Sequence, residues 1–356
     1  MNSVLEEDFE KICSMYSELF EQLKGGRVLI TGACGMITSY LSLLLISVMK
    51  RYDLTLYLQA RNISNLQKKF GLYKNSRLFF QDFSLIEGDI PDIYFDYIIH
   101  AASPASTKFF KEQPVDVIAP NVIGTWNLLQ FCKNKKVKKF LFFSSNSIYG
   151  EFGDKLELLS ESDYGTVDPI SERSCYIESK RLCEQMCVAF SKQYGIHTNS
   201  IRICHTYGPT FNLDQDTRII PRVIKNLING NDIVIYKDPS SIVQYTYVAD
   251  MVTAVLFVLL KGKNGEVYNG CGDECILMDD AIEIMFQSIP ELNSKITEKE
   301  IDDNYNFSNG KGVNLRKISN DKIKSLGWKP LFTNIDGFSR SVRSYILDQN
   351  DSKLVR

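Results

Sequence analysis

Histidine is scarce in this sequence, which holds only three, at positions 100, 197 and 205. Zinc sites are built mainly from closely spaced histidine and cysteine ligands, and the chain shows no such spacing. We therefore expect no metal site. The nine cysteines are an odd number without framework spacing, and several fall inside predicted strands or helices. That distribution is typical of reduced, buried thiols in a cytosolic protein.

Long apolar runs and an excess of either charge are also missing. The longest apolar stretches, residues 41–49 and 252–260, are too short to span a bilayer. Basic and acidic residues number 41 and 43, so there is no electrostatic case for binding nucleic acid or an acidic membrane. The first ten residues are acidic where a signal peptide would be basic. We expect a soluble, cytoplasmic protein, and we find no repeats or low-complexity linker.

A glycine-rich turn joins a predicted strand to a predicted helix near the start of the chain. Residues 27–31 form an apolar strand, Gly32 and Gly35 follow, and an apolar helix runs to about residue 50. Glycine lets the backbone approach a pyrophosphate, and the helix amino terminus supplies N–H groups and a positive dipole. An ordinary strand–helix turn can look similar, but the flanking elements favour nucleotide binding. Thr38 stands where a third glycine would ease packing of the helix on the strand.

The end of the second predicted strand bears on the choice of cofactor. It carries Arg61 and no acidic residue that would hydrogen-bond the ribose of NAD. Arg61 could meet the extra phosphate of NADP, or it could be a solvated arginine at a helix start. The sequence therefore leaves NAD and NADP open. Asp82 and Phe83, after the third strand, are placed to touch an adenine, and small residues at 101–103 after the fourth would let a cofactor pass close to the backbone.

A tyrosine and a lysine lie four residues apart at the start of a predicted helix over residues 175–194. Tyr176 and Lys180 share one face of this helix. An ammonium beside a phenol favours the phenolate and lowers the phenol pKa. The apolar strand before Ser145 delivers its hydroxyl to the strand's carboxyl end, where it could hold a substrate oxygen while the phenol exchanges a proton. The same pair can arise by accident on a solvated helix face, so the surrounding motifs must decide.

The order of elements predicts an α/β fold, a Rossmann-type doubly wound parallel sheet covered on both faces. Ligands of such sheets bind at the carboxyl ends of the strands, where Gly32, Asp82, Ser103 and Ser145 are expected to converge. We predict an N-terminal helical extension (1–25), an NAD(P)-binding domain (26–204) and a part (205–356) that is mainly a smaller C-terminal α/β substrate-binding lobe, with some chain returning to the Rossmann domain.

The second half of the chain is predicted in less regular pieces. After a strand at 199–204, a turn is predicted at 205–209, a helix at 218–229, a strand at 233–236, a loop at 238–241, a helix at 248–261 and a last amphipathic helix to about residue 347. The first residues, 4–23, are predicted as a single amphipathic helix.

Several motifs together resemble a known family, the extended short-chain dehydrogenase/reductases that include nucleotide-sugar epimerases, dehydratases and decarboxylases. The resemblance covers about residues 26–345, and UDP-glucuronate decarboxylases look most similar. The motifs, in order, are Thr31-Gly-x-x-Gly35, Asp82, His100-Ala-Ala, Asn121-Val-Ile-Gly-Thr125, Ser145-x-x-x-Tyr149-Gly, Tyr176-x-x-x-Lys180 and Tyr207-Gly-Pro209.

The resemblance implies roles for individual residues. Tyr176 would be the acid/base acting on a sugar hydroxyl, usually at C4, Lys180 would hold the nicotinamide ribose, and Ser145 would bind the same sugar oxygen. The predicted cofactor-binding residues are Gly32, Gly35, Met36, Ile37, Arg61, Asp82, Phe83, Ala101, Ala102, Ser103, Asn121, Tyr176 and Lys180. The predicted substrate-binding residues are Ser103, Ser145, Asn146, His205, Thr206, Arg218 and Tyr236.

Departures from the family pattern narrow the expected reaction. The decarboxylases and 4,6-dehydratases carry a carboxylate just beyond the serine or threonine, and this chain has Asn146 and Ser147 there. An arginine that commonly grips the substrate diphosphate is replaced at about Val243, and His205 replaces a common asparagine. Epimerases and ketoreductases need only the hydroxyl, the tyrosine, the lysine and a reversible hydride.

The leading hypothesis is therefore a nucleotide-sugar 4-epimerase. The alternatives are an NADPH-dependent 4-keto-sugar reductase, a UDP-glucuronate decarboxylase or 4,6-dehydratase-like lyase, and a catalytically degenerate nucleotide-binding protein. The resemblance also implies a homodimer in which the predicted helices 114–134 and 175–194 pair into a four-helix bundle. Leu128, Leu129, Phe131, Met186, Val188 and Phe190 could form its apolar stripes or belong to the core. Surface-polysaccharide biosynthesis is the pathway that the family suggests.

Overall fold

A parallel sheet lies at the centre of the molecule. The structure, a computed structural model, describes residues 1–152, 158–216, 218–236, 242–289, 295–299 and 317–354. Within these residues seven strands pair in parallel, in the spatial order β12-β7-β5-β4-β1-β2-β3. The strands are β1 (Arg27–Thr31), β2 (Thr55–Gln59), β3 (Leu78–Gln81), β4 (Tyr97–His100), β5 (Lys139–Ser145), β7 (Thr198–Ile203) and β12 (Val267–Gly270). The predicted doubly wound parallel sheet is confirmed.

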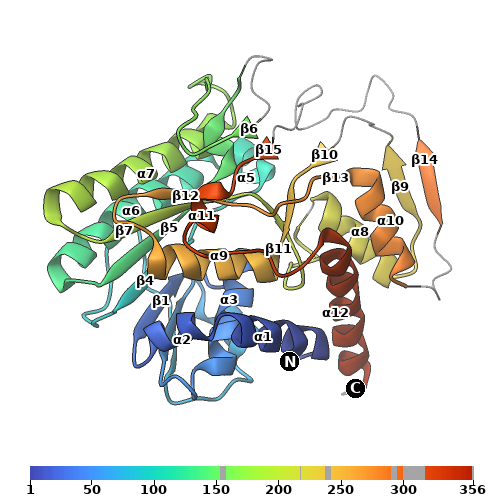
Figure 1. The fold of residues 1–356 in the computed structure, drawn as a ribbon, viewed down its shortest axis with the longest axis horizontal. Coiled ribbons are helices and arrows are strands. Elements are labelled where there is room, and N and C mark those ends of the chain that lie inside the picture. Colours follow the sequence, from blue (N-terminus) through green and yellow to red (C-terminus); the bar gives the residue numbers. More distant parts are fainter. Residues whose placement is uncertain (153–157, 217, 237–241, 290–294, 300–316, 355–356) are drawn as a thin grey trace.

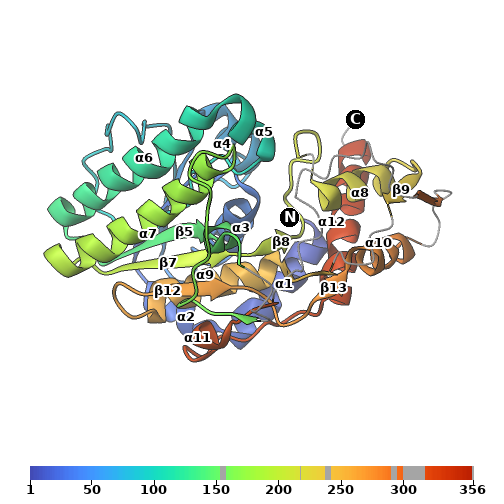
Figure 2. The ribbon, with the colours of Figure 1, turned by 90° about the horizontal axis from the view of Figure 1, so that it is seen from above.

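Both faces of this sheet are covered by helices, as Figures 1 and 2 show. Along β5, Leu141 and Phe143 belong to one buried cluster, whereas Phe140 and Phe142 belong to the other. This alternation is the two-residue period of a strand buried on both sides. The first cluster packs against α3 (Met36–Val48), α4 (Ile63–Phe70) and α9 (Val248–Lys261), and the second against α6 (Pro114–Lys135) and α7 (Ser174–Tyr194).

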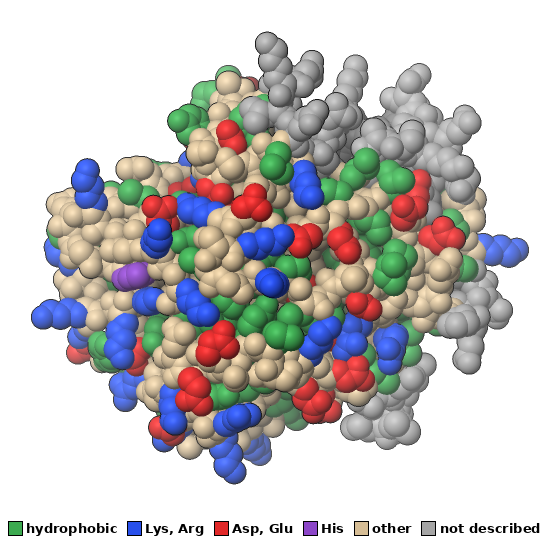
Figure 3. Space-filling model, in the orientation of Figure 1, with side chains coloured by type: hydrophobic (Ala, Val, Ile, Leu, Met, Phe, Trp, Pro, Cys, Tyr) green, Lys and Arg blue, Asp and Glu red, His purple; other side chains and the backbone are tan. Residues whose placement is uncertain are grey.

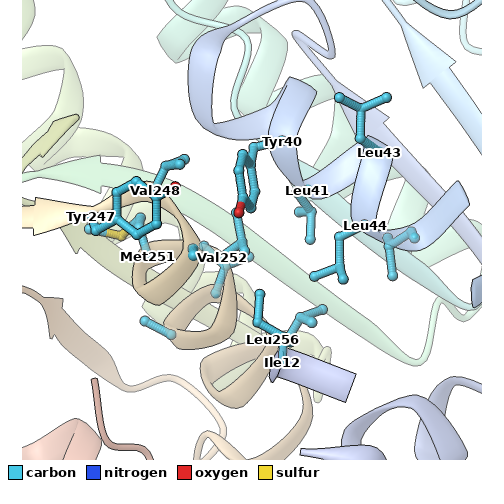
Figure 4. Packing of buried hydrophobic residues seen from close by; sticks show 14 of the residues in the cluster. Ile12, Tyr40, Leu41, Leu43, Leu44, Tyr247, Val248, Met251, Val252 and Leu256 are labelled. Carbon is cyan, nitrogen blue, oxygen red and sulfur yellow. The ribbon is translucent and has the colours of Figure 1, made fainter. Parts of the chain in front are cut away.

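Helix α9 begins and ends at the residues predicted from sequence. All of its residues from Val248 to Leu260 are buried, because the sheet, α3 and the N-terminal helices surround it. Side chains of α3 and α9 meet in this layer, with Tyr40 close to Val252 (Figure 4). Trp328 completes the layer, fully buried, with its indole N–H donating to Thr253 Oγ1 at 2.9 Å.

The N-terminal segment forms two helices, α1 (Ser3–Met15) and α2 (Ser17–Leu23), so the prediction of one continuous helix over 4–23 is wrong. The break lies at Tyr16, whose hydroxyl donates to the carbonyl of Lys329 at 2.7 Å and whose ring packs edge-on against Phe257. A long-range contact thus overrides the local helical pattern. Asp8 of α1 is fully buried and accepts hydrogen bonds from Tyr40 and Tyr247, both at 2.6 Å, and from Arg340.

The prediction of a turn at 205–209 is also wrong in its first half. Residues His205–Tyr207 form β8, which pairs in parallel with β11 (Tyr245–Tyr247). The ring of Tyr207 stacks on Phe338 with 3.9 Å between ring centroids. A strand of three residues that runs into Gly208 and Pro209 is too short to show a period of two, and the pairing partner lies far away in sequence.

The remaining elements lie mostly beyond β8, and the described residues among them include three more two-stranded pairings, β10–β13, β14–β9 and β15–β6. Helix α12 lies beside α8 and α10, away from α6 and α7 (Figure 2). The predicted loop at 238–241 lies outside the described residues. The elements are α5 (Thr107–Glu112), the 3-10 helix η1 (Asn146–Tyr149), β6 (Leu158–Leu159), α8 (Ile219–Ile228), β9 (Ile233–Tyr236), β10 (Ile242–Val243), β13 (Ile276–Leu277), α10 (Met278–Gln287), β14 (Ile296–Lys299), β15 (Lys317–Ile318), α11 (Asp321–Lys324) and α12 (Asn334–Leu354).

The thiols, the possible metal ligands and the surface charges of the described residues bear on the expectations from composition. All nine cysteines fall in the described ranges and are free thiols, five of them buried. Across the described part of the chain, no group of histidine, cysteine and acidic side chains is arranged to hold a metal ion. None of the helices described is both long and apolar enough to cross a bilayer. Basic and acidic side chains are interspersed on the face drawn in Figure 3.

Candidate active site

The carboxyl ends of three neighbouring strands meet at one place in the sheet. Strands β1, β4 and β5 are adjacent, and the chain leaves them at Gly32, Ala101 and Asn146. The strand order changes direction between β1 and β4, and such a switch point opens a crevice in which α/β sheets bind ligands. The structure thus brings together the glycine turn, the small residues after β4 and Ser145.

Gly32 shows why the first turn requires glycine. Its φ is +65°, and a Cβ at this position would lie 2.8 Å from the Cα of Ala102. The backbones after β1 and β4 therefore lie too close together for any side chain at position 32. The sequence treated Thr38 as a departure from the glycine pattern, and the structure gives it a role. Its buried hydroxyl donates to the carbonyl of Gly32 at 2.6 Å, which fastens the loop to the first turn of α3.

The expected adenine end of the crevice contains a residue that the sequence reasoning missed. Gln59, at the end of β2, is buried and spans two loops. Its Oε1 accepts from the N–H of Gly32 at 3.3 Å, and its Nε2 donates to the carbonyl of Phe83 at 3.0 Å. Arg61 and Asp82 are exposed to solvent at the same end. The glutamine's position after an apolar strand was visible in the sequence, but its two partners were not.

His100 belongs to the scaffold beneath the crevice. Its ring nitrogens lie 2.7 Å from Thr31 Oγ1 and 3.1 Å from Thr125 Oγ1, and the ring is buried. Burial, with a smaller effect of the Lys180 charge, lowers the His100 pKa to about 3. The imidazole is therefore neutral at physiological pH and holds β1, β4 and α6 together. Nearby, Asn121 is fully buried, and its Oδ1 has no hydrogen-bond partner among the described residues.

Ser145 and Tyr176, predicted from sequence as a reactive pair, lie side by side in the structure. The Tyr176 side chain is hydrogen-bonded to that of Ser145, and its ring stacks on Phe110 with 4.9 Å between ring centroids. Lys180 is buried beneath them. Its Nζ donates to the carbonyl of Phe143 at 2.7 Å and lies 5.7 Å from the centroid of the Tyr176 ring.

The electrostatics of this pair differ from the expectation. Burial raises the Tyr176 pKa, whereas the Ser145 hydrogen bond and the charges of Arg218 and Arg173 oppose the rise. The expectation that Lys180 lowers this pKa is therefore wrong for the structure as it stands. Burial also lowers the Lys180 pKa to about 8, and the ammonium is engaged with a backbone carbonyl. Arg173, just before α7, had no role in the sequence reasoning.

Of the residues predicted to bind the substrate, His205 and Arg218 lie in the same region as Tyr176. The charges of Arg218 and Arg173 reach both Tyr176 and His205, so these four side chains share one region. Desolvation by the surrounding protein, aided by the same two arginines, lowers the His205 pKa. Arg218 is ion-paired with Asp216. Thr206 is buried, and its hydroxyl donates to the carbonyl of Cys204 at 2.9 Å.

The loop after Ser145 and the strands β9 and β10 carry the remaining positions singled out from the sequence. Asn146 and Ser147 lie in η1, and the N–H of Ser147 donates to Ser145 Oγ at 3.1 Å. Val243 is buried in β10, opposite Ile276. Tyr236 ends β9, but its side chain lies outside the described part. No carboxylate therefore follows Ser145 in this loop.

These features fit a bound dinucleotide. The glycine turn brings its backbone close to the backbone after β4, and α3 begins directly behind it at Met36. A helix amino terminus in that position attracts phosphate. The Oδ1 of Asn121 is a buried acceptor that no described residue satisfies. We infer that Gly32, Gly35, Met36 and Ile37 would hold the pyrophosphate, and Lys180 the ribose next to the reactive ring.

Comparison with known proteins agrees with this geometry. The family model described as "NAD dependent epimerase/dehydratase family" matches residues 28–271. A UDP-glucuronic acid decarboxylase of Arabidopsis thaliana is 31% identical over 313 residues, covering 85% of this chain and 84% of that protein. The dTDP-D-glucose 4,6-dehydratase of Homo sapiens is 26% identical, covering 91% of each chain. The solved UDP-glucuronic acid 4-epimerase of Bacillus cereus, in complex with UDP-glucuronic acid and NAD, has a TM-score of 0.73 at 23% identity, covering 91% of this chain and 99% of that chain.

The fold, the site and these matches define an NAD-dependent enzyme. Within that class, the chain belongs to the NAD-dependent epimerase/dehydratase family. Its relatives include decarboxylases, dehydratases and 4-epimerases of nucleotide sugars.

Proposed function

We propose that this enzyme is a nucleotide-sugar 4-epimerase that works by reversible hydride transfer at C4 of the sugar. The observation that carries the proposal is the hydrogen-bonded Ser145–Tyr176 pair beside the glycine turn, followed by Asn146 and Ser147 instead of a carboxylate. Decarboxylation and 4,6-dehydration were expected to use a carboxylate at that position. A 4-epimerase needs no acid/base beyond the tyrosine.

The chain's own residues supply proton handling and orientation. Ser145 holds the C4 oxygen, and Tyr176 in its phenolate form, which the charges of Arg218 and Arg173 favour, accepts the proton of that oxygen and later returns it. The nicotinamide, when bound, accepts the hydride and gives it back. Arg173, Arg218 and His205 present positive charge or N–H groups on the substrate side and would orient a sugar nucleotide by its phosphates. The elements after β8 would form the lobe that holds this nucleotide.

Two alternatives retain specific support. Arg61 is exposed at the end of β2, where it could bind the 2′-phosphate of NADP, and this favours an NADPH-dependent 4-keto-sugar reductase. The 31% identity to a UDP-glucuronic acid decarboxylase favours that reaction instead. A catalytically degenerate binding protein is disfavoured, because Ser145, Tyr176 and Lys180 are all present and close together.

A single set of incubations separates these reactions. Purified protein is mixed with UDP-glucose, UDP-galactose, UDP-glucuronate or a 4-keto sugar nucleotide, each with and without added NADPH, and the products and coenzyme are measured. We expect interconversion of C4 epimers without net consumption of NADPH and without release of carbon dioxide. Carbon dioxide from UDP-glucuronate would instead establish a decarboxylase. Oxidation of NADPH by a 4-keto sugar nucleotide would establish a reductase.

We also propose a homodimer that pairs α6 and α7 with their copies. The residues predicted as possible stripes mostly face inward, since Leu128, Leu129 and Phe190 are buried core. Other large apolar side chains of these two helices are exposed instead, namely Val115, Ile118, Ile123, Trp126 and Leu182. Several large apolar side chains exposed on two neighbouring helices are typical of an interface between subunits.

The dimer proposal predicts that a charged substitution on this face lowers the molecular mass of the particle in solution from that of a dimer to that of a monomer. Trp126→Glu places a carboxylate at its centre, and we expect the variant to behave as a monomer in size-exclusion chromatography with light scattering. Leu72→Glu is the matched control, because Leu72 is 93% exposed and lies outside both helices. The wild type and the control should both be dimers. A monomeric wild type, or a dimeric Trp126→Glu, would contradict this interface.

A further inference from the structure

A half-buried lysine links the glycine turn to a second loop. Lys69 lies in the last turn of α4, and its Nζ is 3.3 Å from the carbonyl oxygen of Cys34. The same Nζ is 3.5 Å from the carbonyl oxygen of Thr210. Cys34 sits inside the glycine turn, immediately before Gly35. One ammonium group therefore contacts both the predicted phosphate-binding loop and the chain after β8.

Thr210 makes a second connection between the same two loops. Its hydroxyl donates to the carbonyl of Met36, the first residue of α3, at 2.8 Å. Its φ is +82°, which is costly for a β-branched residue and persists only where the surroundings impose it. Thr210 follows Gly208 and Pro209, which lead directly from β8. Any shift of β8 would thus be felt at the glycine turn.

The surroundings of Lys69 make its charge sensitive to what lies nearby. Its side chain lines a cavity of about 350 Å³ between α1, α12 and the 209–211 loop. Among the described residues no carboxylate is ion-paired with Lys69, and burial lowers its pKa to about 8. The titratable groups around it are the Cys34 thiol, which also acts on its charge, and, on the cavity wall, Tyr73, Tyr345, Asp348 and the amino group of Met1.

We propose that Lys69 is a positioning residue that couples cofactor binding at the glycine turn to the strand carrying His205 and Thr206. This inference rests on the proposed function, since it requires that the glycine turn binds a dinucleotide. Pyrophosphate at this turn would place negative charge near the ammonium and favour its protonated form. By linkage, cofactor affinity must then fall as the pH rises and the amine loses its proton.

Direct binding measurements on the full chain test the proposal. The dissociation constant of NADH is measured by fluorescence titration between pH 6.5 and 9.5, and kcat is measured with saturating substrates. We expect Lys69→Met to weaken NADH binding roughly tenfold at pH 7, the loss typical of a hydrogen bond from a charged group. We expect kcat to change little, because the Ser145–Tyr176 pair is untouched.

Two further variants separate positioning from general damage. Lys68→Met removes an exposed lysine from the same helix and should bind NADH like the wild type. Lys69→Arg keeps a permanent charge at this position, so its NADH affinity should fall less steeply through pH 8 than that of the wild type, in which both Lys69 and Lys180 lose protons there. Equal NADH affinity in Lys69→Met and Lys68→Met, or an unchanged pH dependence in Lys69→Arg, would overturn the inference. Failure of the wild type to bind NADH and NADPH would overturn the proposed function as well.

Discussion

Tyr176→Phe is expected to reduce turnover of the sugar nucleotide by about 10²–10⁴-fold, the usual contribution of a positioned acid or base. The substitution removes one hydroxyl and keeps the ring stacked on Phe110. The phenol is the titratable group that is hydrogen-bonded to Ser145, and phenylalanine leaves no proton acceptor at that position. Turnover is measured with the sugar nucleotide identified by the incubations, and cofactor binding by fluorescence titration. Binding should persist, because the glycine turn is unaffected.

A second tyrosine of the same helix provides the control. Tyr194 is the last residue of α7 and is partly exposed, far along the helix from Tyr176. Tyr194→Phe should retain wild-type turnover. If Tyr176→Phe also retained it, Tyr176 would not be the acid/base and the proposed mechanism would fail. If it lost cofactor binding together with turnover, its role would be structural.

Asp8→Ala is expected to lower the free energy of unfolding by about 3–5 kcal/mol, the range typical when one partner of a buried ionic network is removed. Asp8 is fully buried and accepts hydrogen bonds from Tyr40, Tyr247 and Arg340. Alanine would leave two hydroxyls and the Nε of Arg340 without their acceptor, while the other end of that guanidinium keeps Glu7 and the carbonyl of Val4. The loss would be felt between α1, α3, β11 and α12 at once. Chemical denaturation with a linear extrapolation measures the effect.

Glu10→Ala on the same helix is the matched comparison. Its side chain is exposed, and surface substitutions of this kind usually change the unfolding free energy by less than about 0.5 kcal/mol. Similar midpoints for the two variants would show that the buried carboxylate contributes little. If the dependence of the unfolding free energy on denaturant concentration became less steep for Asp8→Ala alone, α1 would separate before the rest of the fold unfolds.

The parts of the fold that could be predicted from sequence are those with a local pattern. Helix α9 and strand β9 were predicted at their observed bounds, because an apolar run of the right length between turns leaves few alternatives. The break at Tyr16 and the β8–β11 pairing were missed. Both depend on partners such as Lys329 and Tyr245, which are remote in sequence. Periodicity carries no information about such contacts.

The candidate site divides in the same way. Gly32, Ser145, Tyr176 and Lys180 could be found because their residue types and spacing reflect chemistry that any dinucleotide-dependent enzyme of this kind needs. Gln59, Arg173 and Lys69 could not be found, since a buried amide or a lone basic residue has no distinctive spacing. The sequence pattern treated Thr38 only as a departure, because a glycine at that position is explained by the space that packing requires. The structure shows that the Thr38 hydroxyl instead contributes a hydrogen bond to the carbonyl of Gly32.

The two tryptophans occupy opposite environments, which gives this protein two separate fluorescent reporters. Trp328 is sealed beside α9 and should emit at short wavelength until the whole chain unfolds. Trp126 is 47% exposed on α6, and iodide or acrylamide should quench it in an isolated subunit. Quenching that disappears as protein concentration rises would report subunit association by light alone, without altering a single residue.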